Sequence, residues 1–197
     1  MRSDSEKADS MRSDSWGSAA HAALDHYRAG RIADAEQTIR DTFAAGVVDE
    51  TNRGHAVVML RLMAICQFEV GRHHDAIQTC AQAEQVGGQA PDVYAIAAKC
   101  AEAMGDELQA FGCWSAAHVF RSSDLVAGSG TWLAQVGMGR ILARAGNLAA
   151  AATHFCDALE STDDAFTPEK RVGVDAELAD VRRRWAEAQQ ARAQDDA

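Results

Sequence analysis

Between Val57 and Pro91 the chain carries two apolar runs joined by a short polar turn. The first run ends at Gly71, and the second begins at Ala76 after the polar residues 72–75. In both runs the apolar residues recur three and four positions apart, which is the period of a helix with one buried face. The stretch therefore predicts two helices joined by a tight turn, that is, a helix hairpin.

The same pattern recurs at three other places along the chain. A glycine followed five positions later by an alanine occurs at Gly30/Ala35, Gly71/Ala76, Gly105/Ala110 and Gly146/Ala151. Seven positions before each glycine lie Ala23, Ala64, Ala98 and Gly139, and nine positions after it lie Ile39, Cys80, Trp114 and Phe155. Glycine suits the left-handed residue that ends many helices, and small side chains let two antiparallel helices approach closely. The sequence thus predicts four hairpins, over residues 15–44, 52–85, 92–121 and 131–160.

With these residues the chain resembles the tetratricopeptide repeat (TPR) family, whose unit is 34 residues long. The interval from Gly71 to Gly105 is 34 residues, and the intervals before and after it are 41 residues each. Seven extra residues make about two helical turns, so they lengthen a connection without rotating the buried face much. The resemblance covers about residues 15–164. It implies an all-α, right-handed solenoid of helix hairpins with about four repeats.

Two further segments complete the predicted organisation. Residues 1–14 are polar and are predicted to form a flexible tail, ahead of the repeat domain at 15–164. Residues 165–197 are predicted to form a helix that caps the stack and frays at its end, with Thr167 as its N-cap and Pro168 as its first residue. One stripe of this helix is apolar: Val174, Leu178, Val181, Trp185 and Ala188. The seven extra residues of each longer interval fall within 45–52 and 122–130, and no strand is predicted.

Charge and hydropathy exclude several partners. The formal net charge is −10, whereas proteins that bind nucleic acids or anionic membranes rely on a basic surface. The N-terminal MRSDSEKADS lacks the apolar core of a signal peptide, and no run of about 18 apolar residues occurs. We therefore expect a cytoplasmic protein that binds neither nucleic acid nor membrane.

The residues that could carry chemistry do not form a recognisable site. The five cysteines include no CxxC pair, so we expect them to act as small hydrophobic residues. The His-His-Asp triplet at 73–75 lies in a polar turn with no further ligands placed beside it. His154, Cys156 and Asp157 share a helix but point to different faces. No P-loop, dinucleotide fingerprint, HExxH or GxSxG motif occurs. We predict a non-enzymatic protein with no cofactor and no metal.

The resemblance to TPR proteins implies that the first helix of each hairpin lines a concave groove. Counting from the repeat glycines assigns ten residues to this groove: Leu24, Tyr27, Arg28, Val58, Arg61, Ile65, Phe68, Lys99, Arg140 and Arg144. The first half of the set is mostly apolar and the second half is cationic. It predicts a groove for an extended peptide with apolar anchors and acidic groups. The alternative is that the apolar residues pack between repeats and the cations face solvent.

Three classes of function are open, of which a small-molecule or enzymatic role in a pocket between helices is the least favoured. The other two are as follows. The first is a protein-interaction module that binds an extended peptide or partner protein in the groove. Within it, residues 91–120 resemble the third repeat of type III secretion translocator chaperones, which implies a secretion chaperone or adaptor. The second is a structural scaffold or regulatory subunit that uses the convex face or the C-terminal helix for assembly. Exposed apolar groove residues would also favour a homodimer.

Overall fold

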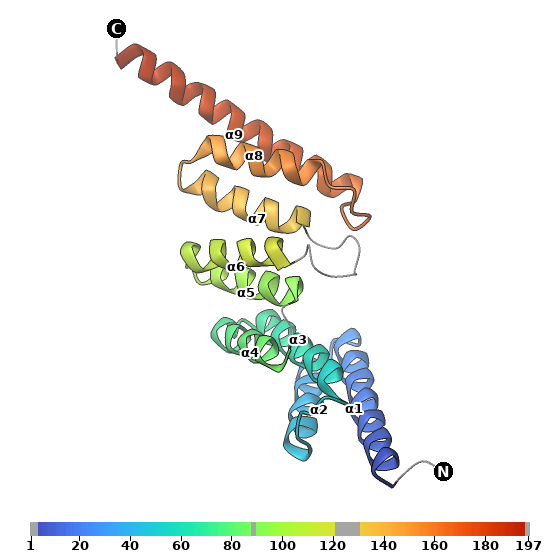
Figure 1. Ribbon diagram of the computed structural model, residues 1–197. Coiled ribbons are helices and arrows are strands. Elements are labelled where there is room, and N and C mark those ends of the chain that lie inside the picture. Colours follow the sequence, from blue (N-terminus) through green and yellow to red (C-terminus); the bar gives the residue numbers. More distant parts are fainter. Residues whose placement is uncertain (1–3, 88–89, 121–130, 196–197) are drawn as a thin grey trace. The chain divides into compact units, whose positions relative to one another are not determined.

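The computed structural model describes residues 4–87, 90–120 and 131–195 (Figure 1). Within these residues every regular element is an α-helix, which confirms the all-α prediction. The helices are α1 (Asp4–Arg28), α2 (Ile32–Ala45), α3 (Arg53–Glu69), α4 (His73–Val86), α5 (Pro91–Ala103), α6 (Glu107–Phe120), α7 (Thr131–Arg144), α8 (Leu148–Leu159) and α9 (Pro168–Asp195). None of the helices in the described ranges is both long and apolar enough to cross a membrane.

The chain divides into two compact units, Met1–Gly105 and Asp106–Ala197. The first unit holds α1 to α5 and the second holds α6 to α9. The sequence predicts one repeat domain over 15–164, and the boundary between the units falls in the turn of its third hairpin. Each unit is therefore described by itself below.

Left-handed glycines close the turns as the repeat pattern predicts. The backbone φ angle is +72° at Gly30, +78° at Gly71, +77° at Gly105 and +80° at Gly146. In the first turn the N–H of Arg31 donates to the carbonyl of His26 at 2.9 Å, and that of Gly30 to the carbonyl of Tyr27 at 2.9 Å. These two bonds are the Schellman arrangement, which satisfies the last carbonyls of a helix. A residue with a Cβ would strain this conformation, so glycine ends the helix here.

Small residues form the hairpin contacts. In the first unit Ala23 and Ala64 have no exposed surface, and neither have Ala35 and Ala76 across the turns. In the second unit Gly139 takes the same place, and a Cβ added to it would lie 3.0 Å from the ring of Phe155. The bulky residues nine positions after the glycines are all buried: Ile39, Cys80, Trp114 and Phe155. The small-residue prediction is confirmed.

The N-terminal helix is longer than the sequence predicts. α1 begins at Asp4, so most of the predicted flexible tail at 1–14 is helical. Residues 4–14 contain no glycine or proline and include good helix formers such as Glu6, Lys7 and Ala8. They lack an apolar stripe, and a helix without one leaves no periodic signal in the sequence. This is why the prediction started the helix near Ser15.

The first insertion forms an ordered loop held by a buried amide. Asn52 is 1% exposed, donates Nδ2–H to the carbonyl of Val47 at 3.0 Å and accepts from the N–H of Asp49 at 3.0 Å. Asn52 is also the N-cap residue of α3. The Asn52 side chain makes no capping bond to α3 and holds the loop instead. The second insertion, at 122–130, lies outside the described residues.

α9 packs on α8 from its start as far as about Arg182. It begins at Pro168, and Val174, Leu178 and Val181 are buried in the core of the second unit together with Phe166. Trp185, the next residue of the predicted stripe, is 45% exposed. Figure 1 shows the C-terminal part of α9 continuing beyond the end of α8. The apolar stripe is thus covered in its first half and open at Trp185.

Candidate peptide-binding surface on the A helices

We call the helix before each repeat glycine an A helix: α1, α3 and α5 in the first unit and α7 in the second. The ten predicted groove residues, which we call the A-helix surface, all lie on these helices. Eight belong to the first unit, where α1 packs against α3 and α3 against α5. Arg140 and Arg144 lie on α7 in the second unit, and their place beside the other eight stays a prediction.

The apolar members of this surface differ in how much of them reaches solvent. Val58 is 48% exposed, and Ile65 and Phe68 on the same helix are half-buried. Leu24 is half-buried and packs against the core of the first unit, so part of its side chain already contributes to packing. The Phe68 ring lies 5.4 Å from the ring of His73 at the start of α4. α3 therefore supplies most of the accessible apolar surface.

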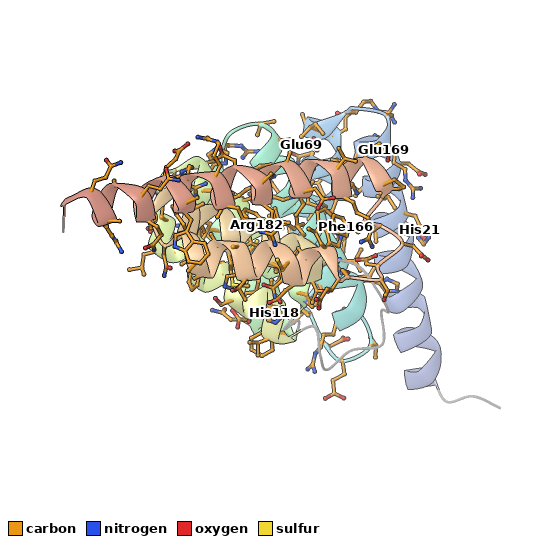
Figure 2. All side chains as sticks on the ribbon, turned by 90° about the horizontal axis from the view of Figure 1, so that it is seen from above. His21, Glu69, His118, Phe166, Glu169 and Arg182 are labelled. Carbon is orange, nitrogen blue, oxygen red and sulfur yellow. The ribbon has the colours of Figure 1, made fainter. Side chains whose placement is uncertain are left out.

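A hydrogen bond joins the first two A helices. The Tyr27 hydroxyl on α1 donates to Oε1 of Glu69 on α3 at 2.6 Å. The carboxylate accepts from the phenol but repels the phenolate, and this bond raises the pKa of Tyr27 to about 12. Glu69 is labelled in Figure 2. The sequence places Tyr27 in the groove, and the structure gives it a partner on the neighbouring A helix.

An ion pair joins the second and third A helices, α3 and α5. The Arg61 guanidinium on α3 pairs with the Asp92 carboxylate at the start of α5, and both side chains are more than a third exposed. Burial lowers the pKa of Arg61 from its ordinary value, yet a guanidinium stays charged throughout the physiological range. Arg61 therefore connects the second and third A helices.

The two predicted cations of the second unit are also paired. Arg140 donates through Nε and Nη2 to both carboxylate oxygens of Glu177 on α9, at 2.8 and 2.6 Å. Arg144 donates to Glu107 on α6 at 2.6 Å. The first pair has the two-pronged geometry that makes arginine–carboxylate bonds strong and specific. Both arginines tie α7 to its neighbours.

The predicted cationic half of the surface is thus largely neutralised within the protein. Arg28 lies 3.9 Å from Asp25 and is exposed, and Lys99 is exposed. Charge at this surface is therefore weaker than the sequence suggests. The partner of Arg61 could have been found from the sequence, because the same repeat count places the oppositely charged Asp92 on the next A helix.

The other candidate residues form no reactive site. His73 lies at the start of α4, and no group of three or more His, Cys, Asp or Glu in the described ranges could hold a metal ion. All five cysteines are free thiols, and Cys66, Cys80 and Cys100 are buried. Burial, with the charges of Glu36 and Glu69, raises the pKa of Cys66 to about 11. A thiol with this pKa is a poor nucleophile at neutral pH.

Comparisons with known proteins agree with these helix hairpins. Neither a protein-family model nor a curated protein matches this chain. Among solved structures, the Yersinia enterocolitica type III secretion translocator chaperone SycD is 17% identical over 72% of this chain and 97% of its own, with a TM-score of 0.59. SycD in complex with a peptide of the translocator YopD is 19% identical over 64% of this chain and 91% of its own, with a TM-score of 0.55.

A third similar structure is a tetratricopeptide repeat protein from Parabacteroides merdae. It is 15% identical over 90% of this chain and 64% of its own, with a TM-score of 0.66. At these identities the likeness is one of fold. The chain therefore has the TPR-like helical-hairpin fold that its sequence predicts.

Proposed function

We propose that this chain is a protein-interaction module that binds an extended segment of a partner protein on its A-helix surface. One observation carries the proposal: Val58, Ile65 and Phe68 lie seven and three positions apart on α3, so they share a face, and all three reach solvent. The polar links from Tyr27 and Arg61 hold the neighbouring A helices beside them. SycD, whose structure is similar to this chain, was solved in complex with a peptide of the translocator YopD, which supports a peptide ligand for this fold.

The chemistry favours recognition by apolar anchors over recognition by charge. The links between A helices order the surface before a ligand arrives, which lowers the entropic cost of binding. The Arg61–Asp92 pair is partly exposed, and such pairs contribute about 0–1 kcal/mol. A carboxylate of the ligand could therefore replace Asp92 at small cost, and exposed Lys99 offers a second cation. The partner segment should carry apolar residues first and acidic groups second.

Within this class we propose a cytoplasmic secretion chaperone or adaptor. The likeness to the translocator chaperone SycD, which covers 72% of this chain, supports it. The residues that resemble the third repeat of such chaperones lie in 91–120. In this role the protein keeps a segment of its partner extended until it is delivered, with no catalytic step and no cofactor.

A scaffold or regulatory subunit is the second candidate. It is favoured by α9, which exposes Trp185 beyond the part that packs on α8. Tryptophan is enriched among the few interface residues that contribute most of the binding free energy. In this case assembly, including a homodimer, would use α9 and not the A helices.

The test is affinity capture from an extract of the native cells, with two matched double variants. Val58→Asp with Lys99→Glu changes two accessible residues of the A-helix surface without breaking the Arg61–Asp92 pair. Leu108→Asp with Arg192→Glu makes the same kinds of change on exposed residues of α6 and α9. Circular dichroism checks that both keep the wild-type helicity.

The proposal expects one abundant partner that the first variant loses and the second retains. A partner lost only with Trp185→Ala would support the scaffold on α9. A partner retained by all three variants would show that the A-helix surface does not bind it.

A further inference from the structure

A groove lies in the first unit between α2 and α4, with α3 as its floor. Its volume is about 610 Å³, within the range of ligand pockets. We call it the α2–α4 groove. None of its lining residues belongs to the A-helix surface, so a ligand here would occupy a different site from the one proposed above.

The floor and one end of this groove are apolar. Leu60 and Met63 of α3 form the floor and are 6% and 8% exposed. Phe43 of α2, Val48 of the following loop and Val86 of α4 are half-buried along the walls and pack against the core of the first unit. These side chains leave a surface on which apolar groups of a ligand could be buried.

Amide side chains line the α4 wall. Gln78, Gln82 and Gln85 are exposed and are spaced by four and three positions, so they form a row on one face of the helix. Within the residues that the structure describes, the side-chain amides of these three make no hydrogen bond, while their backbone groups belong to the helix. Each side-chain amide has an NH₂ group that can donate to a peptide carbonyl and a carbonyl oxygen that can accept from a peptide N–H.

The charged residues of the groove are already paired. Arg40 donates to Glu36 at 2.8 Å, and Asp75 lies 3.8 Å from Arg72. Arg40 and Asp75 are the only ionisable side chains among the lining residues. The lining therefore presents apolar and amide surface with one positive and one negative group, so it has no net charge and no preference for a ligand of either sign.

The dimensions favour an extended ligand over a helical one. Neighbouring glutamines on α4 are offset by about 4.5–6 Å along the helix, and backbone groups on one side of an extended chain repeat about every 6.6 Å. A helical ligand already uses its backbone groups in its own hydrogen bonds, whereas an extended segment has them free for the glutamines. An extended segment could place alternate side chains on the floor and its backbone along the glutamines.

We propose that the α2–α4 groove binds an extended, uncharged peptide segment in which apolar and small polar residues alternate. The apolar side chains rest on Leu60, Met63 and Phe43. The peptide backbone exchanges hydrogen bonds with the row of glutamines. This site is independent of the A-helix surface, so a partner could be held at two places along the first unit.

The experiment is a titration of the isotope-labelled full chain, followed by nuclear magnetic resonance of the glutamine side-chain amides and the Met63 methyl group. Three sets of short peptides, blocked at both ends, serve as probes. The first alternates valine or leucine with serine or threonine. The second replaces the polar residues by glutamate, and the third places the apolar residues at helical spacing.

The first set should shift the signals of Gln78, Gln82, Gln85 and Met63 saturably. Gln78→Ala with Gln82→Ala should weaken binding about tenfold, since two hydrogen bonds are lost. Gln189→Ala with Gln190→Ala, which removes two exposed amides from α9, should leave it unchanged. A peptide N-methylated on its backbone should bind the wild type more weakly than the unmethylated peptide does. The two peptides should bind the Gln78/Gln82 variant equally, which would show that the peptide N–H groups and these glutamines interact.

Three results would overturn the proposal. One is an absence of shifts at these four residues with every peptide set. Another is equal or tighter binding of the glutamate or helically spaced peptides, which would assign the groove to an acidic or a helical partner. The third is shifts that depend on protein concentration without peptide, which would assign it to a second copy of the chain. None of these depends on whether Val58 and Lys99 bind a partner.

Discussion

Gly137 of α7 lies against the indole ring of Trp114 on α6, so close that a Cβ at this position would overlap the ring. Trp114 is 2% exposed and occupies the bulky position of its repeat. The absence of a side chain at Gly137 is therefore what lets α6 and α7 pack.

Gly137→Ala should destabilise the second unit. The added methyl group must displace a buried ring, and overpacking of this kind costs about 1–3 kcal/mol. Urea denaturation followed by circular dichroism measures the free energy of unfolding. Gly173→Ala on α9 is the matched control, because nothing lies within 4 Å of a Cβ there. This control should be neutral or stabilising by up to about 1 kcal/mol, since alanine favours a helix. Equal effects of the two changes would refute the steric explanation.

Tyr27 should ionise later than an ordinary tyrosine. Its pKa is raised from 10.0 to about 12, first by the bond to Glu69 and second by burial of the half-buried phenol. The difference in tyrosinate absorbance between the wild type and Tyr27→Phe isolates this titration. Glu69→Gln should move it back toward pH 10. The contribution to stability is complete below about pH 10 and is lost as the pH rises toward 12, because the unfolded phenol ionises first. A Tyr27 titration near 10 in the wild type would show that the link is absent in solution.

Acid should weaken the second unit through His154. Burial and the neighbouring His118 lower its pKa, although Asp157 acts in the opposite direction, and its ring bonds to Gln135. Because the unfolded histidine protonates first, stability is complete above about pH 6.5 and falls as the pH drops below it. His154→Gln should flatten this part of the unfolding free energy profile. His74→Gln on α4 is the control, because it replaces a histidine of the first unit and leaves the second unit unchanged. Identical slopes for both variants would rule His154 out as the cause.

The cysteines should react in two groups. Cys113 and Cys156 are half-buried and should be alkylated first, whereas Cys66, Cys80 and Cys100 are buried and should react only on unfolding. With a pKa of about 11, Cys66 is thiolate at only about one part in 10⁴ at pH 7. Iodoacetamide labelling with peptide mass spectrometry gives the order. Early labelling of Cys66 would mean that α3 opens locally.

The two halves of α9 should differ in their effect on stability. A chain that ends at Thr167 loses the buried Val174, Leu178 and Val181. At about 1.5–3 kcal/mol each, this loss approaches the total stability of a typical domain. The second unit should then unfold or aggregate. A chain that ends at Trp185 keeps these residues and should unfold within about 0.5 kcal/mol of the wild type. Thermal melts of both truncated chains measure these effects. If the chain that ends at Trp185 also melted at a lower temperature than the wild type, the distal half of α9 would contribute to stability.

The hairpins were predictable because their determinants are local. A left-handed glycine and an alanine five positions later fix a turn within one stretch of chain, and the pattern placed Gly30, Gly71, Gly105 and Gly146 correctly. The start of α1 was not predictable, because a helix without an apolar stripe has no period to detect. The division into two units depends on contacts between distant residues, which periodicity does not report.

The candidate surfaces also depend on contacts between helices that the sequence pattern does not report. Repeat counting placed Arg61 and Tyr27 on the A helices, but their pairing with Asp92 and Glu69 depends on which side chains meet across helices. The row Gln78, Gln82 and Gln85 looks like an ordinary solvated face in the sequence. Only the position of α2 relative to α4 makes it the wall of a groove.

The distal part of α9 also matters for how this protein can be labelled. From Trp185 to the end of the helix is about ten residues, or about 15 Å of regular helix, and most of its side chains are exposed. Figure 2 labels Arg182, which comes just before this part, where α9 still lies beside α8. The guanidinium of Arg182 lies 3.6 Å from the sulfur of Cys156. A fluorophore on Gln194 would thus lie outside the packed part of α9 and would leave the core of the second unit unchanged. A partner that binds the distal part of α9 would change the fluorescence directly, whereas a partner bound elsewhere would not.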